Sequence, residues 1–213
     1  ARSIAFVDEL YKTLACQSYT SSIELARERG HFDVWNFDRD MTSEFLRRVY
    51  DELPQDVQKL WREFGRRNIA NTTTAPCGSV SVCAQTTSGI EPTIFLKYTR
   101  KKKINDGDHD VRVDSVDAVG DRWMHFNLVH HGLLRWMKTT MPPTDIEAWI
   151  TSQSDTGVED SPYWKATASD IAVVDKIKIQ AAAQRWLCHA VSNTANLPSD
   201  VTVETVDELY RMA

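Results

Sequence analysis

The sequence predicts an α/β fold that is rich in helix and has few strands. Long segments carry apolar residues at three- and four-residue spacing, which is typical of amphipathic helices. Short segments rich in β-branched residues lie between them and indicate strands. With 213 residues, 42% of them hydrophobic, the chain can bury a sizeable core as one domain or a large part of one. The strands are too few to close a sheet.

Residues 1–67 are predicted to be helical. A first helix is expected from about residue 3 to residue 29, where Gly30 suits the C-terminal cap. Residues 42–43 open a second helix. Pro54 then starts a third helix in its first turn, where a missing N–H is not needed, and this helix is expected to stop near Gly65.

Residues 68–104 are predicted to form a strand, a loop and a second strand. Residues 69–74 are β-branched and lead into a loop of small residues at 75–81. Residues 93–104 predict the second strand, which becomes basic toward its end.

Residues 105–213 are predicted to hold helices and one late strand, which completes a single partial domain over residues 1–213. The expected strand covers residues 190–197. The expected helices cover residues 121–137, a short segment ending at residue 150, a long segment from Ser169 or Asp170 to residue 189, and the residues after Thr202.

Charge and cysteine content exclude several classes of protein. A net charge of −5 and a pI near 5.7 argue against a general nucleic-acid or membrane-surface binder. The four cysteines form no Cys-x-x-Cys pair, which is typical of a reduced intracellular protein. We expect no signal peptide, and the sequence has no apolar run long enough to cross a bilayer. Both ends lie within helical patterns, so we expect a piece of a longer or split chain.

The segment at residues 75–92 has the composition of an anion-binding loop. Gly78 lets backbone N–H groups approach a phosphate closely, and the hydroxyls of Ser79 and Ser81 add donors. The Walker and Rossmann glycine patterns are both absent. The residues alone leave open a tight surface turn that binds nothing.

Several motifs follow one another along the chain. They are Arg-Asn-Ile-Ala at residues 67–70, Ala-Pro-Cys-Gly-Ser-Val-Ser at 75–81, Thr-Ser-Gly-Ile-Glu-Pro at 87–92, Tyr-Thr-Arg-Lys-Lys-Lys at 98–103, Ser-Pro-Tyr-Trp at 161–164 and Ser-Asn-Thr-Ala-Asn-Leu-Pro at 192–198. In this order they resemble the large, catalytic chain of ribonucleotide reductases, most closely the adenosylcobalamin-dependent class II. The resemblance runs over nearly the whole chain.

The resemblance implies the C-terminal portion of the ten-stranded α/β barrel that surrounds the reductase active site. In the family, the loop matched here holds the substrate's phosphates. Carried over by position, the phosphate-binding residues are Pro76, Cys77, Gly78, Ser79, Val80 and Ser81. Cys77 stands where the family usually has Thr, so a hydroxyl donor is replaced by a weaker thiol donor. We expect a modest loss of affinity.

The resemblance also implies the reaction, the reduction of ribonucleoside di- or triphosphates to deoxyribonucleotides for DNA synthesis. In the family a thiyl radical removes the ribose 3′ hydrogen, and two further cysteines supply reducing equivalents. The radical cysteine lies upstream of every matched motif, so we expect no catalytic residue in this chain. The family cofactor, adenosylcobalamin, is expected to be bound mostly outside it.

The implied partners are a ribonucleotide substrate and a companion chain that carries the rest of the reductase, with a dimer left open. We expect no nucleic-acid or membrane partner, and a cytoplasmic location in a bacterial or phage-infected cell. The chain alone is expected to be inactive. Two alternatives stay open: a non-catalytic assembly or scaffold piece, and a flavin or other phosphate-ligand module that shares only the loop chemistry.

The remaining reactive residues have plainer interpretations. The histidines at 125, 130 and 131 predict no metal site, because no matching carboxylate or cysteine set accompanies them. Cys83 is expected to pack, and Cys16 and Cys188 to lie in helices as small buried apolar residues. Glu91 either caps a helix start or orients the phosphate loop, and the sequence does not decide between these roles.

Overall fold

A computed structural model describes residues 2–105, 107–108, 110–152 and 154–212. The chain divides into two compact units. Unit 1 holds the residues up to Cys77, Gly89–Glu91 and the residues from Ala172 onward. Unit 2 holds Gly78–Ser88 and Pro92–Ile171.

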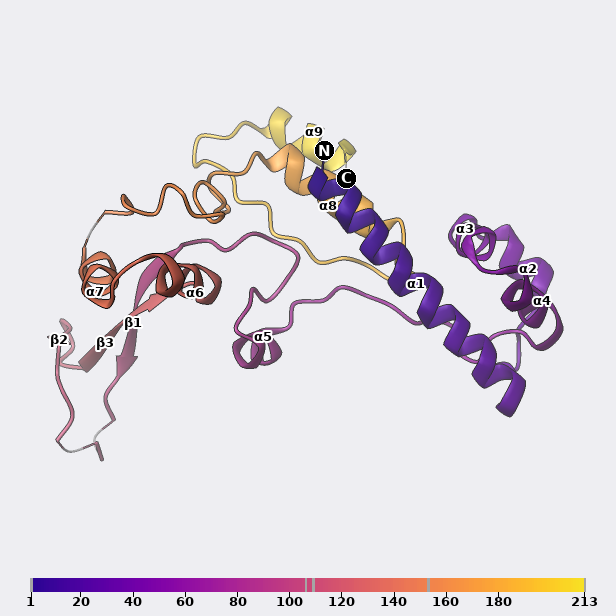
Figure 1. The fold of residues 1–213 in the computed structure, drawn as a ribbon, viewed down its shortest axis with the longest axis horizontal. Helices are drawn as coiled ribbons and strands as arrows, with labels where there is room; N and C mark the ends of the chain where they lie inside the picture. Colours follow the sequence, from indigo (N-terminus) through magenta and orange to yellow (C-terminus); the bar gives the residue numbers. More distant parts are fainter. Residues whose placement is uncertain (1, 106, 109, 153, 213) are drawn as a thin grey trace. The chain divides into compact units, whose positions relative to one another are not determined.

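Unit 1 is helical. Its helices are α1 (Arg2–Arg29), α2 (Phe37–Thr42), α3 (Glu44–Glu52), α4 (Gln55–Phe64), α8 (Val173–Gln184) and α9 (Val203–Met212). The long helix α1 packs against α3, α4 and α8 (Figure 1). Its core gathers Ala15, Tyr19, Ile23, Leu46, Val49, Tyr50, Leu53, Trp61 and Trp186.

The ends of these helices follow from local chemistry. Gly30, at φ 78°, ends α1 in the left-handed conformation that glycine adopts without strain. The Ser43 hydroxyl accepts the N–H of Leu46 and caps α3. Gly65, at φ 77°, ends α4, and a side chain there would collide with the Trp35 ring. The first three predicted helices are therefore confirmed.

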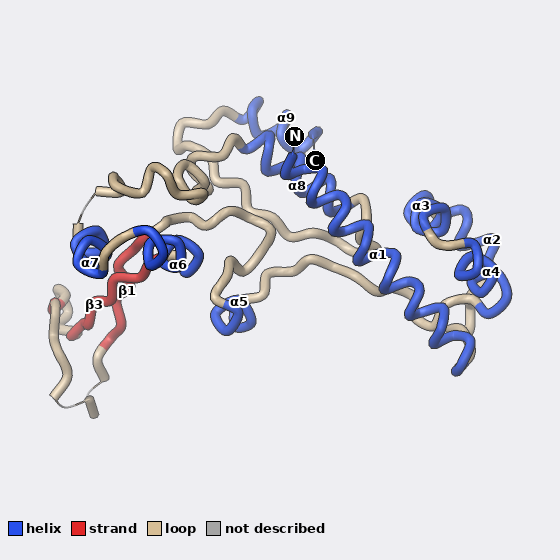
Figure 2. The backbone as a smooth tube through the Cα atoms, in the orientation of Figure 1, coloured by secondary structure: helices blue, strands red, loops and turns tan. Residues whose placement is uncertain are grey.

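Unit 2 combines a small antiparallel sheet with helices. Its strands are β1 (Lys97–Lys103), β2 (Ser115–Val116) and β3 (Arg122–Val129), in the order β1-β3-β2 (Figure 2). Its helices are α5 (Gly78–Ala84), α6 (His131–Thr140) and α7 (Pro143–Thr151). The core of this unit gathers Leu96, Leu133, Met137, Ile146, Trp149 and Val158.

The predicted helix over residues 121–137 is wrong in its first half. Residues 122–129 form β3, which pairs with β1 from Lys97 opposite Val129 to Lys103 opposite Trp123. Pairing with a segment distant in sequence decides the conformation here, because β propensity depends on cross-strand neighbours. The helix begins only at His131.

The predicted strands at residues 69–74 and 190–197 are reduced to one parallel bridge, Thr74 with Val191. The Thr74 N–H donates to Ala190, and the Ser192 N–H donates back to Thr74. The His189 N–H also donates to Thr72, but among the described residues only Thr74 and Val191 meet as a bridge. The neighbouring helix α8 also ends earlier than predicted, at Gln184.

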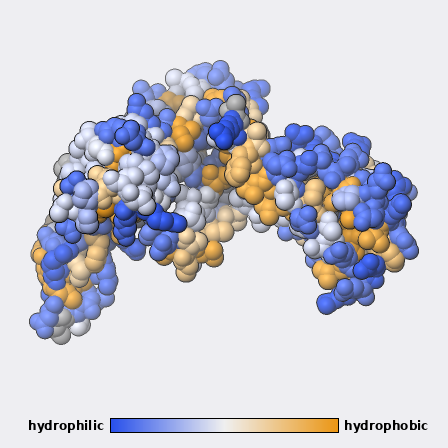
Figure 3. Space-filling model, viewed as in Figure 1, coloured by the Kyte–Doolittle hydropathy of each residue, from blue (hydrophilic) through white to orange (hydrophobic). Residues whose placement is uncertain are grey.

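The described part of the chain is therefore α/β, rich in helix, and forms no closed barrel. None of its described helices is both long and apolar enough to cross a bilayer. Apolar side chains are mixed with polar ones over its surface (Figure 3). On α1 the side chains of Phe6, Leu10 and Leu14 stay 68%, 45% and 50% exposed, at the four-residue spacing of one helix face.

Candidate functional site

The short helix α5 lies within the predicted phosphate segment, residues 75–92. The helix begins at Gly78, and its first-turn N–H groups have no acceptor inside the helix. Gly78, Ser79 and Val80 are all exposed. A Cβ atom on Gly78 would meet nothing within 4 Å, so the space around this residue is open. The first turn of α5 therefore presents hydrogen-bond donors at an accessible surface.

The other predicted site residues are placed differently. Ser81 is 8% exposed, and its hydroxyl donates to the Gly78 carbonyl at 2.7 Å, which closes the first turn of α5. Pro76 and Cys77 belong to unit 1 and are exposed. The Cys77 thiol donates to the Ala75 carbonyl at 3.3 Å. The Ser81 hydroxyl thus stabilises the helix and is already hydrogen-bonded within it.

The segment that precedes Ala75 is held firmly within unit 1. Thr74 is paired with residues 190–192, and its hydroxyl lies 3.0 Å from the Tyr11 hydroxyl on α1. Thr73 adds a bond from its hydroxyl to the Ala190 carbonyl at 2.8 Å. This end of the predicted phosphate segment therefore starts from a fixed position.

Glu91 has a structural partner. Its Oε1 accepts the N–H of Thr194 at 2.8 Å. A side chain on Gly89 would overlap the Glu91 carboxylate, so that glycine is needed for the close approach. Glu91 therefore ties the segment after Ser88 to the late segment around Thr194, a pairing that the sequence could not reveal.

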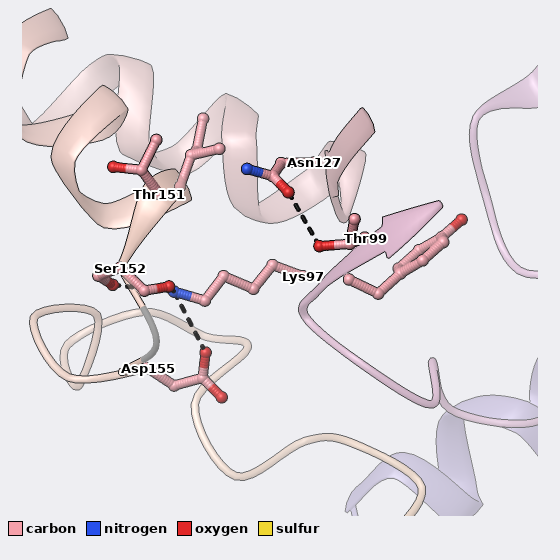
Figure 4. Close-up of a pocket in the computed structure, with 8 residues that line it drawn as sticks. Lys97, Thr99, Asn127, Thr151, Ser152 and Asp155 are labelled. Atoms are coloured by element: carbon pink, nitrogen blue, oxygen red, sulfur yellow. Dashed lines mark hydrogen bonds and ion pairs between the residues drawn. The ribbon is translucent and has the colours of Figure 1, made fainter. Parts of the chain in front are cut away.

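A cavity of about 280 Å³ in unit 2 lies beside Lys97 (Figure 4). The Lys97 ammonium donates to the carbonyls of Trp149 at 2.8 Å, Ser152 at 3.0 Å and Ser154 at 2.7 Å. Asp155 lies 3.8 Å away, and the ammonium stands 4.1 Å from the Trp149 ring centroid. Burial lowers the pKa of Lys97, and Asp155 partly opposes this. Lys97 therefore acts as a clamp: its hydrogen bonds hold the C-terminal end of α7 (Pro143–Thr151) to strand β1.

The histidines have roles in the fold. The His130 ring accepts the Leu133 N–H at the start of α6 and packs 5.0 Å from the Tyr163 ring. Burial, and then the neighbouring His131, lower the pKa of His130. The His125 Nε2 lies 2.8 Å from the Ser115 hydroxyl, across the β2–β3 pair. Within the described ranges, no group of three or more His, Cys, Asp or Glu residues could hold a metal ion.

Cys83 and Cys188 differ from their predicted places. Cys83 is exposed on α5, so the prediction that it packs is wrong. Cys16 lies in α1, as predicted. Cys188 lies beyond the end of α8, and its sulfur accepts the N–H groups of Asn71 and Thr72. The sequence missed this contact because no local signal brings residue 188 to residues 71–72.

The chain resembles one family of known proteins along its length. A family model described as "Ribonucleotide reductase, barrel domain" matches residues 1–213. The chain is 27% identical over 215 residues to the vitamin B12-dependent ribonucleoside-diphosphate reductase of Mycobacterium tuberculosis. The alignment covers 98% of this chain and 25% of that protein.

Two further relatives carry similar names. The vitamin B12-dependent ribonucleoside-diphosphate reductase of Thermoplasma acidophilum is 26% identical over 92% of this chain and 22% of that protein. The vitamin B12-dependent ribonucleotide reductase of Streptantibioticus cattleyicolor is 25% identical over 91% of this chain and 35% of that protein. The chain thus spans between about a fifth and about a third of the length of these relatives.

Proposed function

Because the chain belongs to the ribonucleotide reductase barrel-domain family, we propose that it holds the phosphates of a ribonucleotide substrate with residues 76–80 in a complete reductase. The observation that carries this proposal is the first turn of α5. It starts at Gly78, inside the family motif, and its N–H donors are accessible. Backbone N–H groups at such a position bind phosphate oxygens without reading the base.

The proposed roles of the residues follow their placement. The N–H groups of Gly78, Ser79 and Val80 bind phosphate oxygens, and the Ser79 hydroxyl adds a donor. Ser81 supports them by closing the turn on the Gly78 carbonyl. The exposed Cys77 thiol donates more weakly than the hydroxyl of the family's usual threonine. This replacement weakens binding modestly and leaves the backbone donors intact.

The wider proposal is that the chain forms the late part of the ten-stranded barrel of a B12-dependent reductase. The names of the three relatives support adenosylcobalamin as the cofactor, which would supply the radical that starts the reaction. The cavity beside Lys97 is small and polar-walled and does not fit a corrinoid. We propose that the rest of the reductase binds most of the cofactor, and we assign no catalytic step to the residues of this chain.

The reaction proposed for the complete reductase is thiyl-radical reduction of a ribonucleoside di- or triphosphate to a deoxyribonucleotide. A companion chain, or a further part of the same protein, would carry the radical and redox cysteines. The competing function is a non-catalytic scaffold piece with an intact but unused loop. Titration of the assembled reductase with nucleotide separates the two, because a scaffold would not bind the substrate.

The phosphate site is tested by replacing Gly78→Leu in the assembled reductase. The fold has open space at this position, so the leucine blocks the approach of phosphate without clashing inside the protein. We expect the KM for the ribonucleotide to rise about tenfold or more, the effect of losing a hydrogen bond to a charged group. Steady-state kinetics measures it.

The matched control is Gly107→Leu, a second glycine with open space around its Cβ position and outside the loop. It should leave KM unchanged. If Gly78→Leu also leaves KM unchanged, the loop does not hold the substrate's phosphates.

A further inference from the structure

Cys188 lies in a setting built for a negative charge, and the proposed phosphate site does not use it. Its sulfur accepts the backbone N–H groups of Asn71 at 3.0 Å and Thr72 at 3.1 Å. The Thr72 hydroxyl lies 3.6 Å away. Two amides and a hydroxyl thus converge on one sulfur atom, and in the neutral form the thiol itself donates to the Thr72 carbonyl at 3.3 Å. Cys188 is half-buried.

The second observation is the buried hydroxyl of Tyr19. This side chain is 0% exposed, and its hydroxyl has no hydrogen-bond partner at ordinary distance. Cys188 is the neighbouring titratable group: each of the two side chains shifts the pKa of the other. A buried donor without an acceptor is rare in proteins, because it costs the full desolvation of that group. An oxygen atom on the sulfur would give this donor an acceptor.

The charges around the sulfur favour the thiolate. Burial alone raises the pKa of Cys188, but the N–H groups of Thr72 and Asn71, with the hydroxyls of Thr72 and Tyr19, outweigh it and lower this pKa. Arg66 is near enough for its pKa to be raised by Cys188, and it is paired with Asp40 at 2.9 Å. By contrast, burial raises the pKa of Cys16, the other half-buried cysteine.

We propose that Cys188 is a peroxide-reactive thiolate whose sulfenic acid is held by Tyr19 and by the amides of Asn71 and Thr72. The Cys188 sulfur attacks one peroxide oxygen, so the S–O bond forms as the O–O bond breaks. The sulfur loses two electrons, and the peroxide is reduced to hydroxide or alkoxide, which takes a proton from water. The Tyr19 hydroxyl then donates to the new oxygen. One small thiol displaces that oxygen as water and forms a mixed disulfide with Cys188. A second thiol then attacks this disulfide and releases the Cys188 thiolate.

The first test compares Cys188 with Cys16 in the complete protein. The protein is treated with hydrogen peroxide near neutral pH, trapped with dimedone and analysed by peptide mass spectrometry. Parallel samples are alkylated with iodoacetamide over a pH series. We expect Cys188 to react about tenfold faster or more at neutral pH, since each unit of pKa changes the thiolate fraction about tenfold. Its alkylation midpoint should lie below the ordinary value of 9.0.

The second test replaces Tyr19→Phe. The ring keeps its contacts with Phe45 and Trp61, at 5.9 Å and 5.6 Å, so the core is preserved. The lifetime of the sulfenic acid should fall up to about tenfold, the effect of losing one hydrogen bond between neutral groups. Tyr210→Phe, at a side chain that is 82% exposed, is the matched control and should change nothing.

Two results would overturn the proposal. One is a Cys188 that reacts no faster than Cys16, or that titrates at or above 9.0. The other is an equal sulfenic-acid lifetime in the Tyr19→Phe and Tyr210→Phe proteins. Should Tyr19→Phe fail to fold, the comparison of the two cysteines in the unaltered protein decides alone.

Discussion

At the scale of single residues, the centre of unit 1 is a buried ion pair. Asp40 and Arg66 are each 5% exposed and form two hydrogen bonds, at 2.9 Å each. Trp35 and Trp61 donate their ring N–H groups to the same carboxylate, at 2.9 and 3.1 Å. Every oxygen of Asp40 is thus satisfied, which is the condition under which a buried pair is tolerated.

Asp40→Asn should destabilise the protein by about 3–5 kcal/mol, because the Arg66 charge stays buried without its counter-charge. Urea unfolding, followed by tryptophan fluorescence, measures the change. Asp38→Asn is the control, since Asp38 lies on the same helix α2 and is exposed. A loss below about 1 kcal/mol, the range of surface pairs, would contradict this role for Asp40.

Residue roles were predictable from the sequence only where the partner is near in sequence. Ser43 and Gly65 act through their own helix ends, and both were predicted as helix boundaries or close to them. Asp40 and Cys188 act through residues far along the chain, so nothing near them revealed their partners. Among the six predicted phosphate residues, the hydrogen bond from the Ser81 hydroxyl to the Gly78 carbonyl was not predicted. This bond depends on where α5 starts, which the sequence did not indicate.

At the scale of elements, the same limit explains the main error. The helix α1 was predictable, because its apolar spacing is a local property that persists over 28 residues. Strand β3 was not, since Trp123 and Phe126 are also spaced as on a helix face and only pairing with β1 decides. The basic strand β1 itself was predicted, although four residues too long at its start.

Lys97 joins β1 to the end of α7, and this clamp can be tested. Lys97→Met keeps the aliphatic contact with Trp149 but leaves carbonyls at the end of α7 without their donor. We expect a loss of about 1–3 kcal/mol of local stability. Hydrogen exchange of the α7 peptide should therefore become faster.

Lys101→Met is the control for this clamp, because Lys101 lies on the same strand and is exposed. It should leave the exchange of α7 unchanged. Equal exchange in the two variants would mean that α7 is held by its apolar core contacts alone.

At the scale of the whole molecule, the proposed function gives the chain a phosphate-binding segment and no catalytic residue. The radical and redox cysteines of the proposed reaction are placed in a companion part. We therefore expect the activity of the reductase to require the companion part as well as this chain.

We expect the purified chain to leave a ribonucleotide unchanged, and the assembled reductase to convert it to the deoxyribonucleotide. The physical reason is that phosphate binding positions the ribose, whereas hydrogen abstraction needs a radical that no residue assigned here generates. Product analysis by chromatography, with adenosylcobalamin and a dithiol present in both samples, measures the difference. Reduction of the ribonucleotide by the chain unaided would show that this chain carries the chemistry itself.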